Sequence, residues 1–249
     1  TRPGAMEGVK YFLVPNVKNF SWMTVVAAMG QMFYSLSIAM GILITFGSYM
    51  KKETSLEDST RNVEVFDTAI AIMAGLMIIP AVFAFSGGDP DTLQAGPALM
   101  FITIPKVFEN MGFGTVVGIL FFLLVLFAAV TSSIALTESA VSTFEDELGW
   151  SRRRATVLVG VIMIALGSLS SLGYGPLAGI KIIGMQFLDF FDFLTNSVMM
   201  PIAAMLTSLF VSRIVGMKRM EEEIMHGESK FRRKKIFIVM IKYLCPVFA

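Results

Sequence analysis

The sequence predicts an all-α membrane protein, and three observations lead to that prediction. Of its 249 residues, 55% are hydrophobic and 16% are charged, and the mean hydropathy is +0.72; a soluble domain carries about 25% charged residues. Six apolar stretches are long enough, or nearly so, to cross a hydrocarbon core that takes about 20 helical residues. Lys and Arg gather in alternate segments between these stretches. We therefore expect one transmembrane domain over residues 1–249, made of six membrane helices.

The expected helices follow a polar, mixed segment at residues 1–20. They cover residues 22–50, 65–86, 113–143, 155–171, 187–215 and 236–249. The last stretch ends inside an apolar run, and the first residue is a threonine rather than a methionine. We therefore expect the chain to be part of a longer membrane protein.

The basic residues predict the orientation of these helices in a plasma membrane. If the connecting segments alternate sides, one side carries fourteen Lys and Arg residues and the other carries five. Because cytoplasmic loops hold the excess of positive charge, residues 1–20 and 87–112 should lie outside. The segment 87–112 is nearly uncharged and apolar in its second half, so we expect it to pack as an outer lid rather than extend into water.

Composition also excludes several functional classes. A net charge of +1 gives no basic surface for nucleic acid. One cysteine, Cys245, excludes a disulfide framework, and one histidine, His226, leaves none for a catalytic triad or a zinc site. No His or Lys accompanies the serines of the first and third stretches, which argues against an intramembrane hydrolase. We therefore do not expect an enzyme.

The first stretch places Ser35 and Ser37 two residues apart, followed by the small residues Ala39 and Gly41. One interpretation is a helix that is interrupted near the middle of the membrane, which requires that the exposed backbone line a cavity or lie buried in protein. The other is an intact helix whose serines bond to carbonyl groups of the preceding turn. The pattern alone is consistent with both.

The third stretch carries one stripe of small and hydroxyl-bearing residues. It consists of Ala128, Thr131, Ser132, Ala135 and Leu136. Two adjacent hydroxyl groups in an apolar run could bind a small hard cation such as Na⁺. The stripe could equally be a seam of small residues at which two membrane helices pack.

Acidic residues inside membrane spans are costly and are commonly functional. Asp67 lies just inside the second stretch, where it could instead cap a helix start. Glu138 lies in the expected cytoplasmic half of the third stretch, with no evident partner. Asp189 and Asp192, near the outer end of the fifth stretch, could simply face an aqueous vestibule.

Four motifs make the chain resemble the neurotransmitter:sodium symporter family, in its bacterial leucine-transporter-like branch. Residues 28–41 (AMGQMFYSLSIAMG) with 45–49 (TFGSY) resemble the sixth helix, and residues 96–105 (GPALMFITIP) resemble the fourth extracellular loop. Residues 127–135 (FAAVTSSIA) with 144–148 (FEDEL) resemble the eighth helix, and residues 188–195 (LDFFDFLT) resemble the tenth. The resemblance implies the sixth to eleventh helices of an inverted-repeat symporter fold, the first helix of this chain being broken at mid-membrane.

The resemblance implies two sodium sites, each completed by the family's first helix, which this chain does not contain. Ala128 (through its carbonyl), Thr131 and Ser132 match ligands of one site, and Ser35 and Asp67 match positions of the other. Some relatives hold a chloride ion there, and others a carboxylate one turn further on, where this chain has Ala71. Asp67 would supply the missing negative charge, so that chloride is not required.

The resemblance also implies a substrate pocket and an outer gate. The pocket residues are Tyr34, Ser35, Ser37, Ala39, Met40, Ser132 and Leu136, and the gate residues are Asp192 and Gln31, with Asp189 as a lesser candidate. Ala39 and Met40 replace a glycine and an aromatic residue of the leucine transporter. Because methionine is flexible and polarizable, it would accept varied apolar side chains.

The function implied is a sodium-coupled symport of apolar or aromatic amino acids by alternating access. The expected partners are the amino acid, the lipid bilayer and the N-terminal helices of the same protein, with no nucleic acid. The alternative is a sodium-dependent amino-acid sensor that binds without turnover. A purely structural helix bundle would explain the apolar stretches, but not the paired hydroxyls or the intramembrane Asp67.

Overall fold

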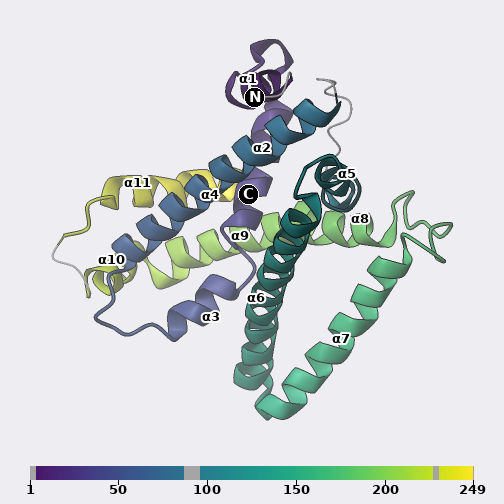
Figure 1. Cartoon of the computed structure of the whole chain (residues 1–249). Helices are drawn as coiled ribbons and strands as arrows, with labels where there is room; N and C mark the ends of the chain where they lie inside the picture. The colour runs from purple at the N-terminus through teal and green to yellow at the C-terminus, as the bar shows by residue number, and fades with distance from the viewer. Residues whose placement is uncertain (1–3, 87–95, 227–229, 249) are drawn as a thin grey trace. The chain divides into compact units, whose positions relative to one another are not determined.

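A computed structural model of the chain describes residues 4–86, 96–226 and 230–248, and the regular structure in these ranges is helical (Figure 1). The chain divides into two compact units. The first unit comprises Thr1–Thr24 and Glu64–Ser132, and the second comprises Val25–Val63 and Ser133–Ala249. The long helices α4 (Leu56–Ser86) and α6 (Gly114–Leu148) each contribute residues to both units.

In the first unit, the short helix α1 (Ala5–Leu13) packs against the C-terminal part of α4. Glycine makes this approach possible, because a Cβ atom on Gly8 would lie 2.7 Å from the Cα atom of Pro80. The Tyr11 and Phe83 rings lie 5.2 Å apart, and the Phe83 side chain is only 2% exposed. Close backbone approach through small residues is the usual way in which membrane helices associate.

The second half of the long segment 87–112 also packs in the first unit. A π-helical turn (Leu99–Thr103) leads into α5 (Ile104–Glu109), whose Ile104 and Val107 are 6% and 5% exposed. The Phe108 ring meets the Phe121 ring of α6 edge-on, with centroids 5.5 Å apart. The apolar half of the segment thus packs on α6, and its role as an outer lid stays a prediction; residues 87–95 lie outside the described residues.

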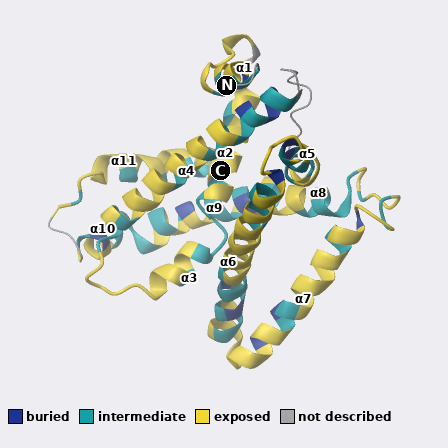
Figure 2. Cartoon of the chain, viewed as in Figure 1, coloured by how far each residue is buried: buried dark blue, intermediate teal, exposed yellow. Residues whose placement is uncertain are grey.

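In the second unit, α7 (Arg152–Leu172) packs against the C-terminal part of α6 by one face. Val141, Ala155 and Val159 form a small core, in which Ala155 is completely buried. Phe144 stacks on Trp150 in the turn between the helices, at 5.5 Å. As a result, the buried residues of α7 lie near its start and most of the helix is exposed within the chain (Figure 2).

The rest of the second unit is a nearly continuous helical run followed by shorter pieces. The run consists of α8 (Phe187–Asp192), a π-helical turn (Phe193–Met199), α9 (Met200–Phe210) and a second π-helical turn (Val211–Val215). After it come α10 (Met217–Met225), α11 (Lys234–Val239), a third π-helical turn (Met240–Leu244) and α12 (Cys245–Phe248). π-Helical turns inside α-helices are frequent at functional positions.

Four helices in the described part of the chain are long and apolar enough to cross a membrane. They are Leu56–Phe85, Gly114–Leu148, Arg152–Leu172 and Phe187–Val215, which match the second to fifth expected spans. The first expected span divides into α2 (Trp22–Ser35) and α3 (Ile42–Ser48), as the interrupted-helix interpretation requires. The sixth corresponds to α11, α12 and the π-helical turn between them.

One alternative from the sequence is wrong. Asp67 does not cap a helix start, because α4 begins at Leu56, eleven residues earlier. The hydroxyl oxygen of Ser55 accepts the backbone N–H of Asp58 at 3.1 Å and so caps this helix. Asp67 therefore lies within a continuous helix, half-buried, as an acidic residue inside a membrane span.

Candidate functional site

The segment between α2 and α3 breaks the helix for six residues, from Leu36 to Gly41. Ser37, Ala39 and Gly41 have φ values of +53°, +63° and +78°. These values belong to the left-handed region, which residues other than glycine adopt at a cost. Alternate left-handed residues turn the chain off the helix axis, so the carbonyl groups here leave the regular i to i+4 pattern.

The two ends of the break are held by backbone hydrogen bonds. The Ile38 N–H donates to the Phe33 carbonyl at 2.8 Å, which ends α2 in a wide turn. The Thr45 N–H donates to the Gly41 carbonyl at 3.0 Å, which begins α3. The candidate pocket residues Ser37, Ala39 and Met40 therefore lie on a defined, non-helical segment.

In the second unit, α6 packs closely on the end of this break. The Ser139 hydroxyl is 7% exposed and donates to the Met40 carbonyl at 3.4 Å, and a Cβ atom on Gly41 would lie 2.6 Å from its oxygen. Thr45 and Ser142 share a hydroxyl–hydroxyl hydrogen bond at 3.3 Å. Small polar groups thus join the start of α3 to the C-terminal half of α6.

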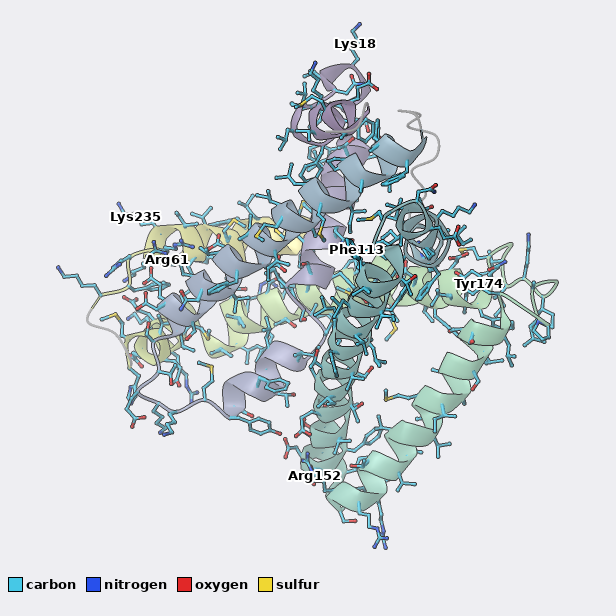
Figure 3. All side chains as sticks on the ribbon, in the orientation of Figure 1. Lys18, Arg61, Phe113, Arg152, Tyr174 and Lys235 are labelled. Carbon is cyan, nitrogen blue, oxygen red and sulfur yellow. The ribbon has the colours of Figure 1, made fainter. Side chains whose placement is uncertain are left out.

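A cluster of charged and polar side chains lies where α3, α6 and α7 meet in the second unit. The Tyr49 hydroxyl donates to one carboxylate oxygen of Glu138 at 2.7 Å, and Arg152 donates to the other at 2.5 Å. Arg152 also reaches Glu145 at 3.2 Å. Figure 3 places Arg152 at the turn between α6 and α7, from where its guanidinium links both helices. No partner of Glu138 could be assigned from the sequence, and the structure gives it two, Tyr49 and Arg152.

The candidate sodium ligands of the first unit lie on continuous helices. Ala128, Thr131 and Ser132 are on α6 and are exposed within this chain. The Thr131 hydroxyl donates to the Ala128 carbonyl at 3.0 Å, which brings two oxygen atoms to one point of the helix surface. Asp67 lies on α4 in the same unit.

The remaining candidates belong to the second unit. They are Gln31, Tyr34, Ser35, Ser37, Ala39, Met40, Leu136, Asp189 and Asp192. Tyr34 and Leu136 are 54% and 48% exposed, so neither side chain is covered within the chain. The structure thus groups the candidates within each unit, and the two-site arrangement stays a prediction.

Both acidic candidates for the outer gate are exposed and lie on one helical run. Asp192 accepts a hydrogen bond from the Asn196 side chain at 2.5 Å, at the point where α8 passes into its π-helical turn. Asp189 lies near Tyr174, which Figure 3 labels in the segment after α7. Burial raises the pKa of the Tyr174 hydroxyl, and the negative charge of Asp189 raises it further.

Comparison with known proteins places these features in a family. The profile of the Sodium:neurotransmitter symporter family matches residues 1–249. A sodium-dependent transporter of Bacillus subtilis is 33% identical over 229 residues, which cover 92% of this chain and 50% of that protein. One from Haemophilus influenzae is 32% identical over 248 residues, covering 99% of this chain and 53% of its own length. The chain therefore spans about half the length of these relatives.

A solved structure agrees with the sequence comparison. The crystal structure of MhsT in complex with L-phenylalanine matches with a TM-score of 0.85 and 35% identity, over 99% of this chain and 55% of the MhsT chain. The match supports the helical architecture and the membrane-spanning character of the protein. The chain belongs to the sodium:neurotransmitter symporter family.

Proposed function

We propose that the protein containing this chain is a sodium-coupled amino-acid symporter that works by alternating access. The observation that carries the proposal is the break between α2 and α3, with left-handed residues at Ser37, Ala39 and Gly41. Broken helices present backbone groups at membrane depth, where they bind ions and polar substrates. Family membership and the sodium-dependent relatives support the coupling to Na⁺.

In this proposal two sodium ions are bound by different sets of ligands. The hydroxyls of Thr131 and Ser132 and the carbonyl of Ala128 serve one ion, from the continuous helix α6. Ser35, at the end of α2, and Asp67 serve the other. The helices that precede this chain complete both sites.

The substrate proposed is an apolar or aromatic amino acid. Tyr34 and Leu136 provide apolar walls, and Met40 adapts its shape to the side chain. MhsT, which is 35% identical, was crystallised with L-phenylalanine, which supports this class. A sodium ion beside the amino-acid carboxylate lowers the cost of moving a zwitterion out of water.

The proposed orientation follows the basic residues, with residues 1–20 and 87–112 outside. The packed half of the second segment, with α5 on α6, then acts as the outer lid. Asp192 with Gln31 forms the outer gate. Chloride is not required, because Asp67 already carries the negative charge that balances Na⁺.

Uptake by the intact protein in proteoliposomes tests the proposal. An inward Na⁺ gradient should drive accumulation of L-phenylalanine or L-leucine, and a K⁺ gradient should not. Ser132→Ala should abolish the accumulation that the Na⁺ gradient drives, because it removes one oxygen ligand of the sodium ion. The matched control is Ser133→Ala, which removes the neighbouring hydroxyl on another face of α6. Sodium-dependent binding without accumulation would favour the sensor, and equal uptake in K⁺ would refute sodium coupling.

A further inference from the structure

The first unit carries a pocket between α5 and the start of α6. Its volume is about 410 Å³, and pockets that bind small molecules commonly measure about 300–1,000 Å³. The lining includes three phenylalanines, three glycines and one charged side chain. None of the residues proposed for sodium, substrate or gate lines it. The pocket is therefore a separate candidate site.

Glycines at the start of α6 bring α5 close and fix one wall of the pocket. A Cβ atom on Gly114 would lie 1.7 Å from the Phe108 carbonyl oxygen, and one on Gly118 would lie 3.3 Å from the Phe108 ring. The same carbonyl accepts the Met111 N–H at 2.9 Å, which closes the turn between the two helices. The wall is therefore formed before any ligand arrives, and a preformed site loses less entropy on binding.

Aromatic rings supply the apolar part of the lining. The Phe108 and Phe122 rings both meet the Phe121 ring edge-on, with centroids 5.5 and 5.3 Å from it, so packing holds them in place. Phe113 also lines the pocket and is 82% exposed at the start of α6 (Figure 3). Aromatic rings attract a cation placed within about 6 Å of their faces. The lining thus suits a ligand that is both apolar and positively charged.

Glu109 is the charged residue of the lining, and its position favours a cation. It ends the helical run from Leu99, where carbonyl groups already carry partial negative charge. Its side chain is exposed and has no ion pair or hydrogen bond with any residue in the described part of the chain. The first turn of α6 borders the pocket and by itself would favour an anion, but a full carboxylate charge exceeds the partial charge of a helix end.

We propose that this pocket binds a small organic cation, in which an alkylated ammonium group is attached to an aromatic or branched apolar body. The Glu109 carboxylate balances the positive charge, and the three phenylalanine rings contact the rest of the ligand. In the orientation that the basic residues predict, the ligand enters from the outside. The inference does not depend on transport or on Na⁺, so it can fail or succeed independently of the proposed function.

A ligand-observed NMR titration of the intact protein tests the proposal, with benzyltrimethylammonium as the probe. L-Phenylalanine and Na⁺ are present in excess, so that the proposed substrate site is occupied. Wild-type protein should bind the probe. Benzyl alcohol, which keeps the ring without the charge, should bind at least fivefold more weakly, and benzenesulfonate, an anion with the same ring, should not bind.

Matched variants separate the pocket from general effects. Glu109→Gln should weaken binding of the probe about fivefold, while Glu7→Gln, which removes an exposed charge from α1, should not change it. Phe113→Ala should also weaken binding about fivefold, while Phe20→Ala, at a ring that is 65% exposed elsewhere in the unit, should not. Thr115→Trp fills the pocket without altering its charge and should abolish binding.

Four outcomes would overturn the proposal. The first is binding of benzenesulfonate or benzyl alcohol as tightly as the cation, and the second is an unchanged affinity in Glu109→Gln. The third is binding of the probe only when L-phenylalanine is left out, which would place it in the substrate site. The fourth is no binding to the intact protein, which would show that another part of that protein fills the pocket.

Discussion

The pair α2 and α3 and the helix α6 both carry hydroxyl groups within an apolar segment, but their backbones differ. Between α2 and α3 the helix is lost for six residues. Through α6 it continues unbroken for 35 residues, past Thr131, Ser132 and Ser139. The comparison shows two ways in which a membrane helix can present oxygen atoms.

In α6 several hydroxyl groups bond to the helix itself, whereas Ser139 donates to the Met40 carbonyl of the break. Thr131 donates to the Ala128 carbonyl, and Thr137 donates to the Ser133 carbonyl at 2.6 Å. Such bonds satisfy the hydroxyl hydrogen and leave oxygen lone pairs available at the surface, without breaking the helix. In the α2–α3 break, left-handed residues turn the backbone carbonyls themselves away from the helix axis. The continuous helix therefore presents mainly side-chain oxygens, and the break adds backbone oxygens that are turned off the helix axis.

The largest expected effect is at the break itself. In Gly41→Ala the new Cβ would lie 2.6 Å from the Ser139 oxygen, at a φ of +78°. Backbone strain of this kind costs about 1–3 kcal/mol, and about 1.4 kcal/mol is tenfold. Sodium-dependent uptake should therefore fall more than tenfold.

The control for this variant is Gly47→Ala in α3, where a Cβ would meet nothing within 4 Å. It should leave uptake intact and stabilise the helix by about 0.5–1 kcal/mol. If both variants transport like the wild type, the conformation of the break is not needed for function.

A second prediction concerns Asp67, the acidic group on the unbroken helix α4. Asp67→Asn removes a full negative charge beside the proposed sodium ion. The apparent Na⁺ affinity should fall at least tenfold, about 1.4 kcal/mol. Chloride should then stimulate uptake by the variant but not by the wild type.

Asp58→Asn, in the first turn of the same helix, is the matched control and should change neither property. Chloride-dependent uptake by wild-type protein would contradict the assignment of Asp67.

The smallest effect is expected at the polar cluster that joins α3, α6 and α7. Glu138→Gln weakens the contacts to Tyr49 and Arg152 by removing the carboxylate charge. The Arg152 side chain of this pair is 58% exposed, and ion pairs with a solvent-exposed partner contribute little to stability, so the melting temperature should change slightly. Uptake should fall severalfold, because α3 is held less firmly, while sodium-dependent binding changes less.

Glu145→Gln, which removes the longer contact of Arg152 at 3.2 Å, should have less effect than Glu138→Gln. If Glu145→Gln lowers uptake more than Glu138→Gln does, the link between α6 and α7, rather than the contact with α3, governs transport.

The sequence predicts the membrane helices well, because the apolar runs are long and the basic residues mark their ends. It did not predict where α4 begins, since residues 56–64 are polar and lie outside the apolar run. The signal was present, because Ser55 followed three residues later by an acidic residue is a helix-start pattern. The π-helical turns, such as Phe193–Met199, have no comparable sequence pattern.

The candidate site was only partly predictable. The break required a choice between two interpretations of Ser35 and Ser37, which the positive φ values decide. The partners of Glu138 could not be found from local sequence, because Tyr49 lies 89 residues away and Arg152 lies across a turn. The sequence carried one indication of the Arg152 contact, because Glu138, Glu145 and Arg152 follow one another at intervals of seven residues.

The most direct test of the central claim is the thermal stability of the intact protein with each amino acid, in Na⁺ and again in K⁺. A ligand at 100 times its dissociation constant adds about 2.7 kcal/mol to the folded state. We predict this stabilisation for a few apolar or aromatic amino acids, and in Na⁺ only. Equal stabilisation in K⁺, or no response to any amino acid, would contradict a sodium-coupled amino-acid site.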